Sequence, residues 1–259
     1  MNIKVLIISA AIFFGFSAAA FSDNNWQEYR CQHFIIYYKD VPQDFLKSVE
    51  EMAEYYYQEI TKNLGFIRYE NWSWDKRAKI YIYNDAQNYI DEGRQAGWSH
   101  GSASFSEKII RTFPTAAGFF DSTLPHELGH IIFREFVGFK ADVPLWMDEG
   151  IAMYQEKAKR WGVNDFVRKA IEEKRFVSLK ELSEMQLNSN TDRDTIDLFY
   201  AESASVVYYL ITEAGEYKFV NFCRALKEGR RFNDALRSVY MRFKDLEELN
   251  KAWVTYLNN

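Results

Sequence analysis

The sequence predicts an α+β fold, in which a small N-terminal sheet with its helices is followed by a helical block. Two compact β-prone runs, FIIYY (Phe34 to Tyr38) and AKIYIYN (Ala78 to Asn84), lie in the first third of the chain. After Ser122, apolar residues recur at helical spacing almost to the end. A hydrophobic content of 47% and an aromatic content of 17% exclude a disordered chain, so we expect a substantial core.

The N-terminal part alternates strand and helix patterns. Asp44 to Leu64 carries apolar residues at helical spacing, and Gly65 is a typical helix stop. Asp85 is expected to open a short helix that runs through Glu92. The Gly- and Ser-punctuated segment Gly97 to Phe113 contains two β-prone runs, which predicts a pair of strands.

The part of the chain after Ser122 is predicted to form helices joined by short turns. We expect them at Leu124–Val137, Leu145–Lys159, Asp165–Glu173, Leu179–Met185, Thr195–Ala214, Tyr217–Glu228, Asn233–Phe243 and Leu246–Leu257. Because no turn is long enough for a flexible linker, residues 23–121 and 122–259 are interpreted as two parts of one domain.

Residues 1–22 have the pattern of a secretory signal peptide. Lys4 precedes the apolar run Val5 to Phe16, and Ala18 and Ala20 have the spacing that a signal peptidase reads. We expect cleavage after Ala20 or Ser22 and export to the periplasm or the medium; an uncleaved N-terminal anchor is the alternative. No later segment is apolar for long enough to cross a membrane, so no stable membrane insertion is expected after the signal is removed.

Net charge and cysteine content bear on the partners and the redox state of the protein. The net charge is −5 with acidic and basic residues well mixed, so no nucleic-acid partner is expected. In an oxidising compartment Cys31 and Cys223 either pair or stay free, and the sequence leaves both alternatives open, as it does the oligomeric state.

The stretch TLPHELGHIIFREF contains the motif H-E-x-x-H. His126 and His130 are four residues apart, so both imidazoles project from one helix face and can reach one metal ion. Glu127 is rotated away from the ligand direction but close enough to act as general base on a water. Ser122 or Thr123 is expected to cap this helix. The alternative is an amphipathic helix that carries two histidines on a polar face.

A catalytic zinc ion takes a third protein ligand and keeps one open position. Glu149, in PLWMDEGIAMYQE, follows His130 by eighteen intervening residues, which suffice for a turn and an antiparallel helix that returns it to the histidines. Gly129 and Gly150 indicate close helix contacts. Asp148 is either an acceptor for a ligating imidazole or an exposed acid. The remaining histidines, His33 and His100, lack ligand spacing.

HELGH followed at this distance by WMDEGIAMY resembles the gluzincin zinc metallopeptidases, especially the small peptidase-MA-like branch. LFYAESASVVYYL (Leu198 to Leu210) and LEELNKAWVTYL (Leu246 to Leu257) are similar to later helices of that branch, and the resemblance covers about Ala78 to Leu257. It implies a zincin-like fold with the active-site helix at the junction of the two parts.

The resemblance also implies the site residues: His126, His130 and Glu149 as zinc ligands, Glu127 as general base, and Tyr200 as an oxyanion donor. Alternatively, Tyr200 is a core residue. An edge strand within Gly101 to Phe113 is implied to hold extended peptide. The motif with which aminopeptidases bind a free α-amine has no clear counterpart, which favours an endopeptidase.

The expected function is therefore that of an exported zinc metallopeptidase acting on a peptide or protein. The rivals are a non-catalytic zinc-binding interaction module and a zinc amidase that acts on a cell-wall component.

Overall fold

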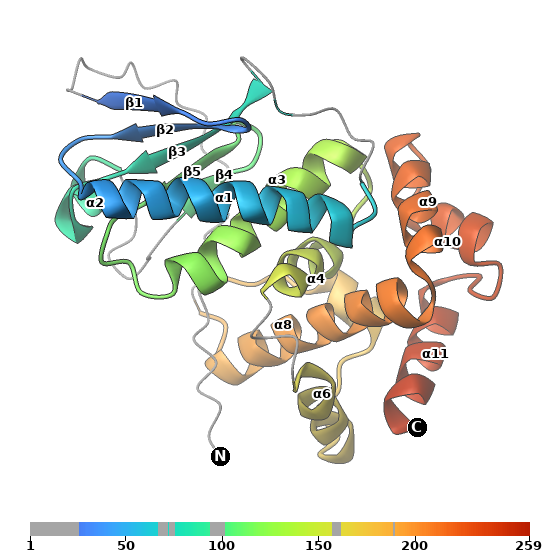
Figure 1. The fold of residues 1–259 in the computed structure, drawn as a ribbon. Helices are drawn as coiled ribbons and strands as arrows, with labels where there is room; N and C mark the ends of the chain where they lie inside the picture. Colours follow the sequence, from blue (N-terminus) through green and yellow to red (C-terminus); the bar gives the residue numbers. More distant parts are fainter. Residues whose placement is uncertain (1–25, 67–71, 73–75, 94–101, 157–161, 189) are drawn as a thin grey trace. The chain divides into compact units, whose positions relative to one another are not determined.

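The computed structural model describes residues 26–66, 72, 76–93, 102–156, 162–188 and 190–259 (Figure 1). The expected signal peptide, His100 and Gly101 lie outside the described residues. The chain forms two compact units, one of Met1–Glu59 and Glu70–Glu127 and the other of Ile60–Tyr69 and Leu128–Asn259. No described helix is both long enough and apolar enough to traverse a bilayer.

The first unit contains a five-stranded sheet in the order β1-β2-β3-β5-β4. Its strands are β1 (Gln27–Arg30), β2 (Phe34–Tyr38), β3 (Ala78–Ile82), β4 (Ser102–Ser104) and β5 (Ile109–Thr112). β2, β3 and β5 run parallel, while β1 and β4 pair antiparallel with β2 and β5 and form the two edges. The α+β expectation is confirmed, and so are the strands at Phe34 and Ala78.

Helix α1 (Gln43–Asn63) runs alongside the sheet (Figure 1), and α2 (Ala86–Asp91) follows β3. The Phe34 ring of β2 meets the Tyr57 ring of α1 edge-on at 6.4 Å, and Phe34, Ile36, Ile80 and Ile110 of the sheet are all buried. Asp85 caps α2 as expected, because its side chain accepts from the backbone N–H of Asn88.

The second unit is helical, in keeping with the expected block. Its helices are α4 (Leu145–Gln155), α6 (Val163–Glu172), α7 (Leu179–Glu184), α8 (Arg193–Tyr208), the π-helical turn η3 (Tyr209–Glu213), α9 (Glu216–Lys227), α10 (Phe232–Tyr240) and α11 (Leu246–Asn258). The active-site candidate helix α3 (Leu124–Val137) has the bounds that the sequence predicts. Gly65, with φ +69°, ends α1 as expected.

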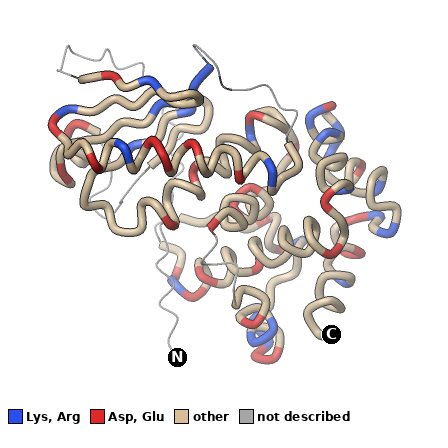
Figure 2. The backbone as a smooth tube through the Cα atoms, in the orientation of Figure 1, with Lys and Arg blue, Asp and Glu red and all other residues tan. Residues whose placement is uncertain are grey.

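Several details differ from the sequence predictions. β1 was not predicted. The long helix expected at Thr195–Ala214 begins at Arg193 and changes to the π-helical turn η3 after Tyr208. The helix expected to reach Phe243 ends at Tyr240, because Met241 takes a positive φ of 51°. Acidic and basic residues are interspersed along the described elements (Figure 2), as their even spread in the sequence suggests.

Candidate metal centre

Helix α3 carries both histidines of the motif on one face. A π-helical turn, η2 (Phe119–Thr123), precedes it directly, and the left-handed Gly118 (φ 72°) begins that turn. The sequence predicts Ser122 or Thr123 as the cap of α3, but both lie within η2 and are already helical, whereas a capping residue has an extended backbone, so this prediction is wrong. His126, Glu127 and His130 are all buried, with 5%, 1% and 0% of their surface exposed.

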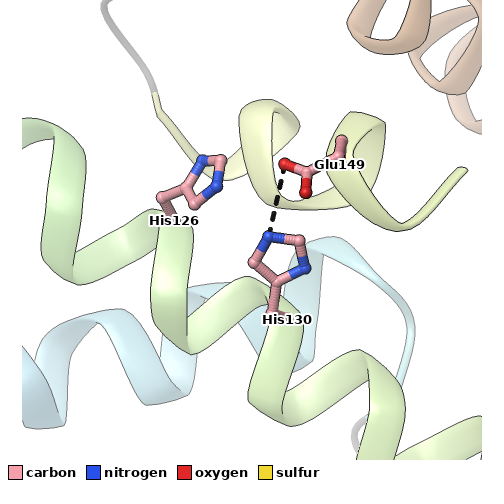
Figure 3. Close-up of side chains that lie close together, drawn as sticks. All are labelled: His126, His130 and Glu149. Atoms are coloured by element: carbon pink, nitrogen blue, oxygen red, sulfur yellow. Dashed lines mark ion pairs between the residues drawn. The ribbon is translucent and has the colours of Figure 1, made fainter. Parts of the chain in front are cut away.

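Glu149 of α4 returns to the two histidines, as the eighteen-residue interval predicts. One ligand atom from each of His126, His130 and Glu149 lies within 4.8 Å of the others, and Figure 3 shows the three side chains converging from α3 and α4. Nε2 of His130 is 3.5 Å from Oε2 of Glu149. Two ligands that are each ~2.1 Å from a tetrahedral zinc are about 3.4 Å apart, so this donor pair fits zinc.

Asp148 contacts the other nitrogen of His130. Its Oδ1 lies 3.2 Å from Nδ1, and its Oδ2 accepts a hydrogen bond from Nε of Arg134 at 2.8 Å. A carboxylate at Nδ1 makes that nitrogen the proton donor and leaves the Nε2 lone pair for a metal. By sequence, Asp148 is either an acceptor for a ligating imidazole or an exposed acid. The structure buries it beside the imidazole.

The charges around His130 favour a cation at its ring. Burial by itself disfavours a charged imidazole, but the carboxylates of Glu149 and Asp148 outweigh it and raise the pKa of His130 well above the usual value. The same two carboxylates would favour a metal cation at Nε2. Two imidazoles and a carboxylate, all buried, match a catalytic zinc site, which takes three protein ligands.

Two glycines allow the helices around this cluster to approach closely. A Cβ atom on Gly129 would lie 3.0 Å from Cα of Ala152, so its absence lets α3 pack against α4. A Cβ atom on Gly150 would lie 2.2 Å from the carbonyl oxygen of Ser203, which brings α4 against α8. The close contacts that the sequence indicates at both glycines are confirmed.

Tyr200 lies on α8 with 7% of its surface exposed, and its ring meets that of Phe199 edge-on at 5.7 Å. It precedes Ser203 and Val207, the two α8 residues nearest Gly150, by three and seven positions, so it belongs to the stripe that faces α4. Its role as an oxyanion donor stays a prediction.

The other candidate residues serve the fold. His33 does not belong to the cluster of His126, His130 and Glu149. Its Nδ1 lies 2.6 Å from Oε2 of Glu54, and its ring stacks on the ring of Tyr57 with the centroids 4.0 Å apart. Cys31 and Cys223 are both buried and free, so the pairing alternative is not what the structure has.

Three comparisons with known proteins bear on this arrangement. No curated protein matches the sequence. Among solved structures, native yeast LTA4 hydrolase is similar with a TM-score of 0.52 and 18% identity over 88% of this chain. Yeast LTA4 hydrolase in complex with bestatin gives a TM-score of 0.49 and 17% identity over 89% of this chain. The chain spans 38% and 39% of the chains in those two structures, and the likeness to the first of them shows the fold alone.

The family comparison covers more of the molecule. The model of the Peptidase MA superfamily matches residues 71–259, which include both motifs and all the helices from α3 onward. This chain therefore belongs to the Peptidase MA superfamily of metallopeptidases.

Proposed function

We propose that this protein is an exported zinc metallopeptidase in which His126, His130 and Glu149 hold the metal and Glu127 is the general base. The observation that carries the proposal is the convergence of three buried ligand atoms within 4.8 Å, one helical position away from a buried glutamate. A purely structural site usually closes its fourth position with another protein ligand and has no use for a general base.

Bound zinc supplies a Lewis acid that polarises the scissile carbonyl and lowers the pKa of water to about 7. Glu127 takes the proton of the attacking water and returns it to the leaving amine. Asp148 holds His130 in the tautomer that leaves Nε2 available. Tyr200 is proposed to donate its hydroxyl hydrogen to the developing oxyanion.

The sheet offers an edge for a peptide substrate. Of the segment Gly101–Phe113, only β4 lies at an edge, because β5 pairs with both β3 and β4. Among the described strands β4 pairs with β5 alone, and its other side suits an extended peptide, which would add to the sheet through backbone hydrogen bonds. Since the sequence has no clear counterpart of an α-amine-binding motif, an endopeptidase is favoured.

The test is a peptide-library digest with the wild-type protein and the Glu127→Gln variant, with zinc content measured in both. We expect cleavage by the wild type, including of N-terminally blocked peptides. Glu127→Gln should keep zinc and the fold but lose hydrolysis, because an amide cannot accept the water's proton. Turnover near the wild-type level in a Glu127→Gln preparation free of contaminating protease would refute the mechanism.

The same preparation separates the rival functions. Cleavage of cell-wall material with no cleavage of peptides would identify an amidase, and zinc binding without either activity would identify an interaction module. Export is tested by N-terminal sequencing of the protein from the periplasm or medium, where a start at Phe21 or Asp23 is expected. A full-length N-terminus would contradict removal of the signal peptide.

A further inference from the structure

Arg134 and His130 hold Asp148 from two sides. The two residues lie four apart on α3, so their side chains leave the same helix face. Arg134 donates through Nε to Oδ2 of Asp148 at 2.8 Å, while Oδ1 lies 3.2 Å from Nδ1 of His130. With 17% and 9% of their side chains exposed, Arg134 and Asp148 form a largely shielded pair rather than a solvated surface ion pair.

This arrangement restricts Asp148 in two ways. The terminal torsion of an aspartate is soft, so a single contact to an imidazole leaves the carboxylate free to turn. The Arg134 donor on Oδ2 fixes the second oxygen and keeps Oδ1 directed at Nδ1. The guanidinium of Arg134 only donates hydrogen bonds, so it occupies Oδ2 as a donor and leaves Oδ1 as the acceptor that faces Nδ1. Nδ1 of His130 must then carry the proton.

We propose that Arg134 is a positioning residue of the metal centre, which fixes the tautomer and orientation of His130 through Asp148. The proposal rests on the zinc site proposed above. Arg134 touches neither metal nor substrate in this scheme. Loss of a residue that contacts a ligand directly weakens metal binding by about 10–100-fold. Arg134 contacts Asp148 and not the proposed ligand itself, so we expect its loss to weaken zinc binding by about tenfold, the lower end of that range.

The experiment measures zinc affinity by competition with a chromophoric chelator in Arg134→Met, Arg134→Lys, Asp148→Asn and the Arg134→Met/Asp148→Asn double variant. Arg193→Met is the matched control, because Arg193 pairs with Asp197 at 3.1 Å on α8 with 58% of its side chain exposed. Arg134→Met should bind zinc about tenfold more weakly, or about 1.4 kcal/mol. Arg134→Lys should recover part of the loss, since an ammonium restores the charge but not the geometry. Arg193→Met should bind as the wild type does.

The double variant tests whether Arg134 acts through Asp148. In the Asp148→Asn background, Arg134→Met should cause no further loss of zinc affinity. The coupling free energy between the two residues then equals the effect of Arg134→Met in the wild-type background. An equal tenfold loss in both backgrounds would overturn the proposal, and so would equal affinities of Arg134→Met and Arg193→Met. If Arg134→Met does not fold, Arg134→Gln takes its place in the cycle.

A second measurement needs no zinc and no activity. The chain has four histidines, so the imidazole N–H signals can be assigned by nitrogen-15 NMR. The Nδ1–H signal of His130 should be protected from exchange in the wild type and in Arg193→Met, and should be lost in Arg134→Met. Equal protection in all three proteins would overturn the proposal. A wild-type protein that takes up no zinc would instead refute the proposed function, while this signal would still decide the role of Arg134.

Discussion

Replacement of Gly150 by alanine tests how the second unit positions the third ligand. The new Cβ would lie 2.2 Å from the carbonyl oxygen of Ser203 and 2.6 Å from Cγ2 of Val207. Val207 can rotate, but the backbone oxygen cannot, so α4 and α8 must separate by about 1 Å to reach an ordinary contact. Such overpacking costs about 1–3 kcal/mol, and alanine regains about 1 kcal/mol of helix propensity. The difference leaves an expected net loss of about 1 kcal/mol in the free energy of unfolding.

The same displacement should reach the metal centre, because Glu149 directly precedes Gly150. A shift of about 1 Å is large beside the 3.5 Å between Glu149 and His130, so zinc affinity should fall together with stability. The assay combines urea unfolding of the zinc-free protein with chelator competition. Gly229→Ala is the control, because its φ of +85° makes alanine strained by about 1–2 kcal/mol. No atom of the described residues lies within 4 Å of the new Cβ, so zinc affinity should not change. Wild-type stability and zinc affinity in Gly150→Ala would refute the packing argument.

Three further predictions concern buried side chains. Glu149→Ala should lose most of its zinc, because two protein ligands remain; unchanged zinc content by metal analysis would remove Glu149 from the ligand set. Tyr200→Phe should lower kcat by ~10²–10³ with the fold intact if the hydroxyl stabilises the oxyanion, whereas an unchanged kcat in a folded protein would make Tyr200 a core residue. Burial raises the pKa of Glu202 from 4.5 to about 8, so the folded protein keeps a proton that the unfolded chain has lost across that range. The wild-type free energy of unfolding should therefore fall as pH rises through this window, by up to about 1.4 kcal/mol per pH unit from this group. In urea unfolding at several pH values, the free energy of unfolding of Glu202→Gln should depend less steeply on pH than that of the wild type. Identical slopes in the two proteins would contradict the raised pKa of Glu202.

Local signals explain why much of the fold could be predicted from the sequence. Helix α3 begins and ends where its apolar spacing does, and Gly65 and Asp85 mark a helix end and a helix start by their own backbone and side-chain chemistry. The histidine pair is equally local, because an interval of four residues places both rings on one helix face whatever the rest of the chain does.

The elements that the sequence did not predict depend on partners far along the chain. All four residues of β1 are exposed, so it has no buried face to give an alternating pattern, and it exists only through its pairing with β2. The π-helical turn η2 has the composition of an ordinary helix start, and Ser122 and Thr123 could therefore be taken for caps. Arg134 could not be identified, because its partner Asp148 arrives only when α4 packs against α3.

Helix α4 can pack against α3 in one register only if the contacts around His130 are to form. Asp148 and Glu149 are neighbours in the sequence, yet they contact opposite nitrogens of one imidazole, Nδ1 and Nε2 of His130. Successive helical residues diverge by about 100°, so this ring must lie in the angle between the two side chains. A slip of α4 by one residue would remove both contacts at once. Gly129 sets how near α4 comes, and the Asp-Glu pair sets where along α3 it stops. The proposed ligand Glu149 and its neighbour Asp148 thus align the helix that carries them. The interval from His130 to Glu149 therefore predicts the site better than either residue does alone.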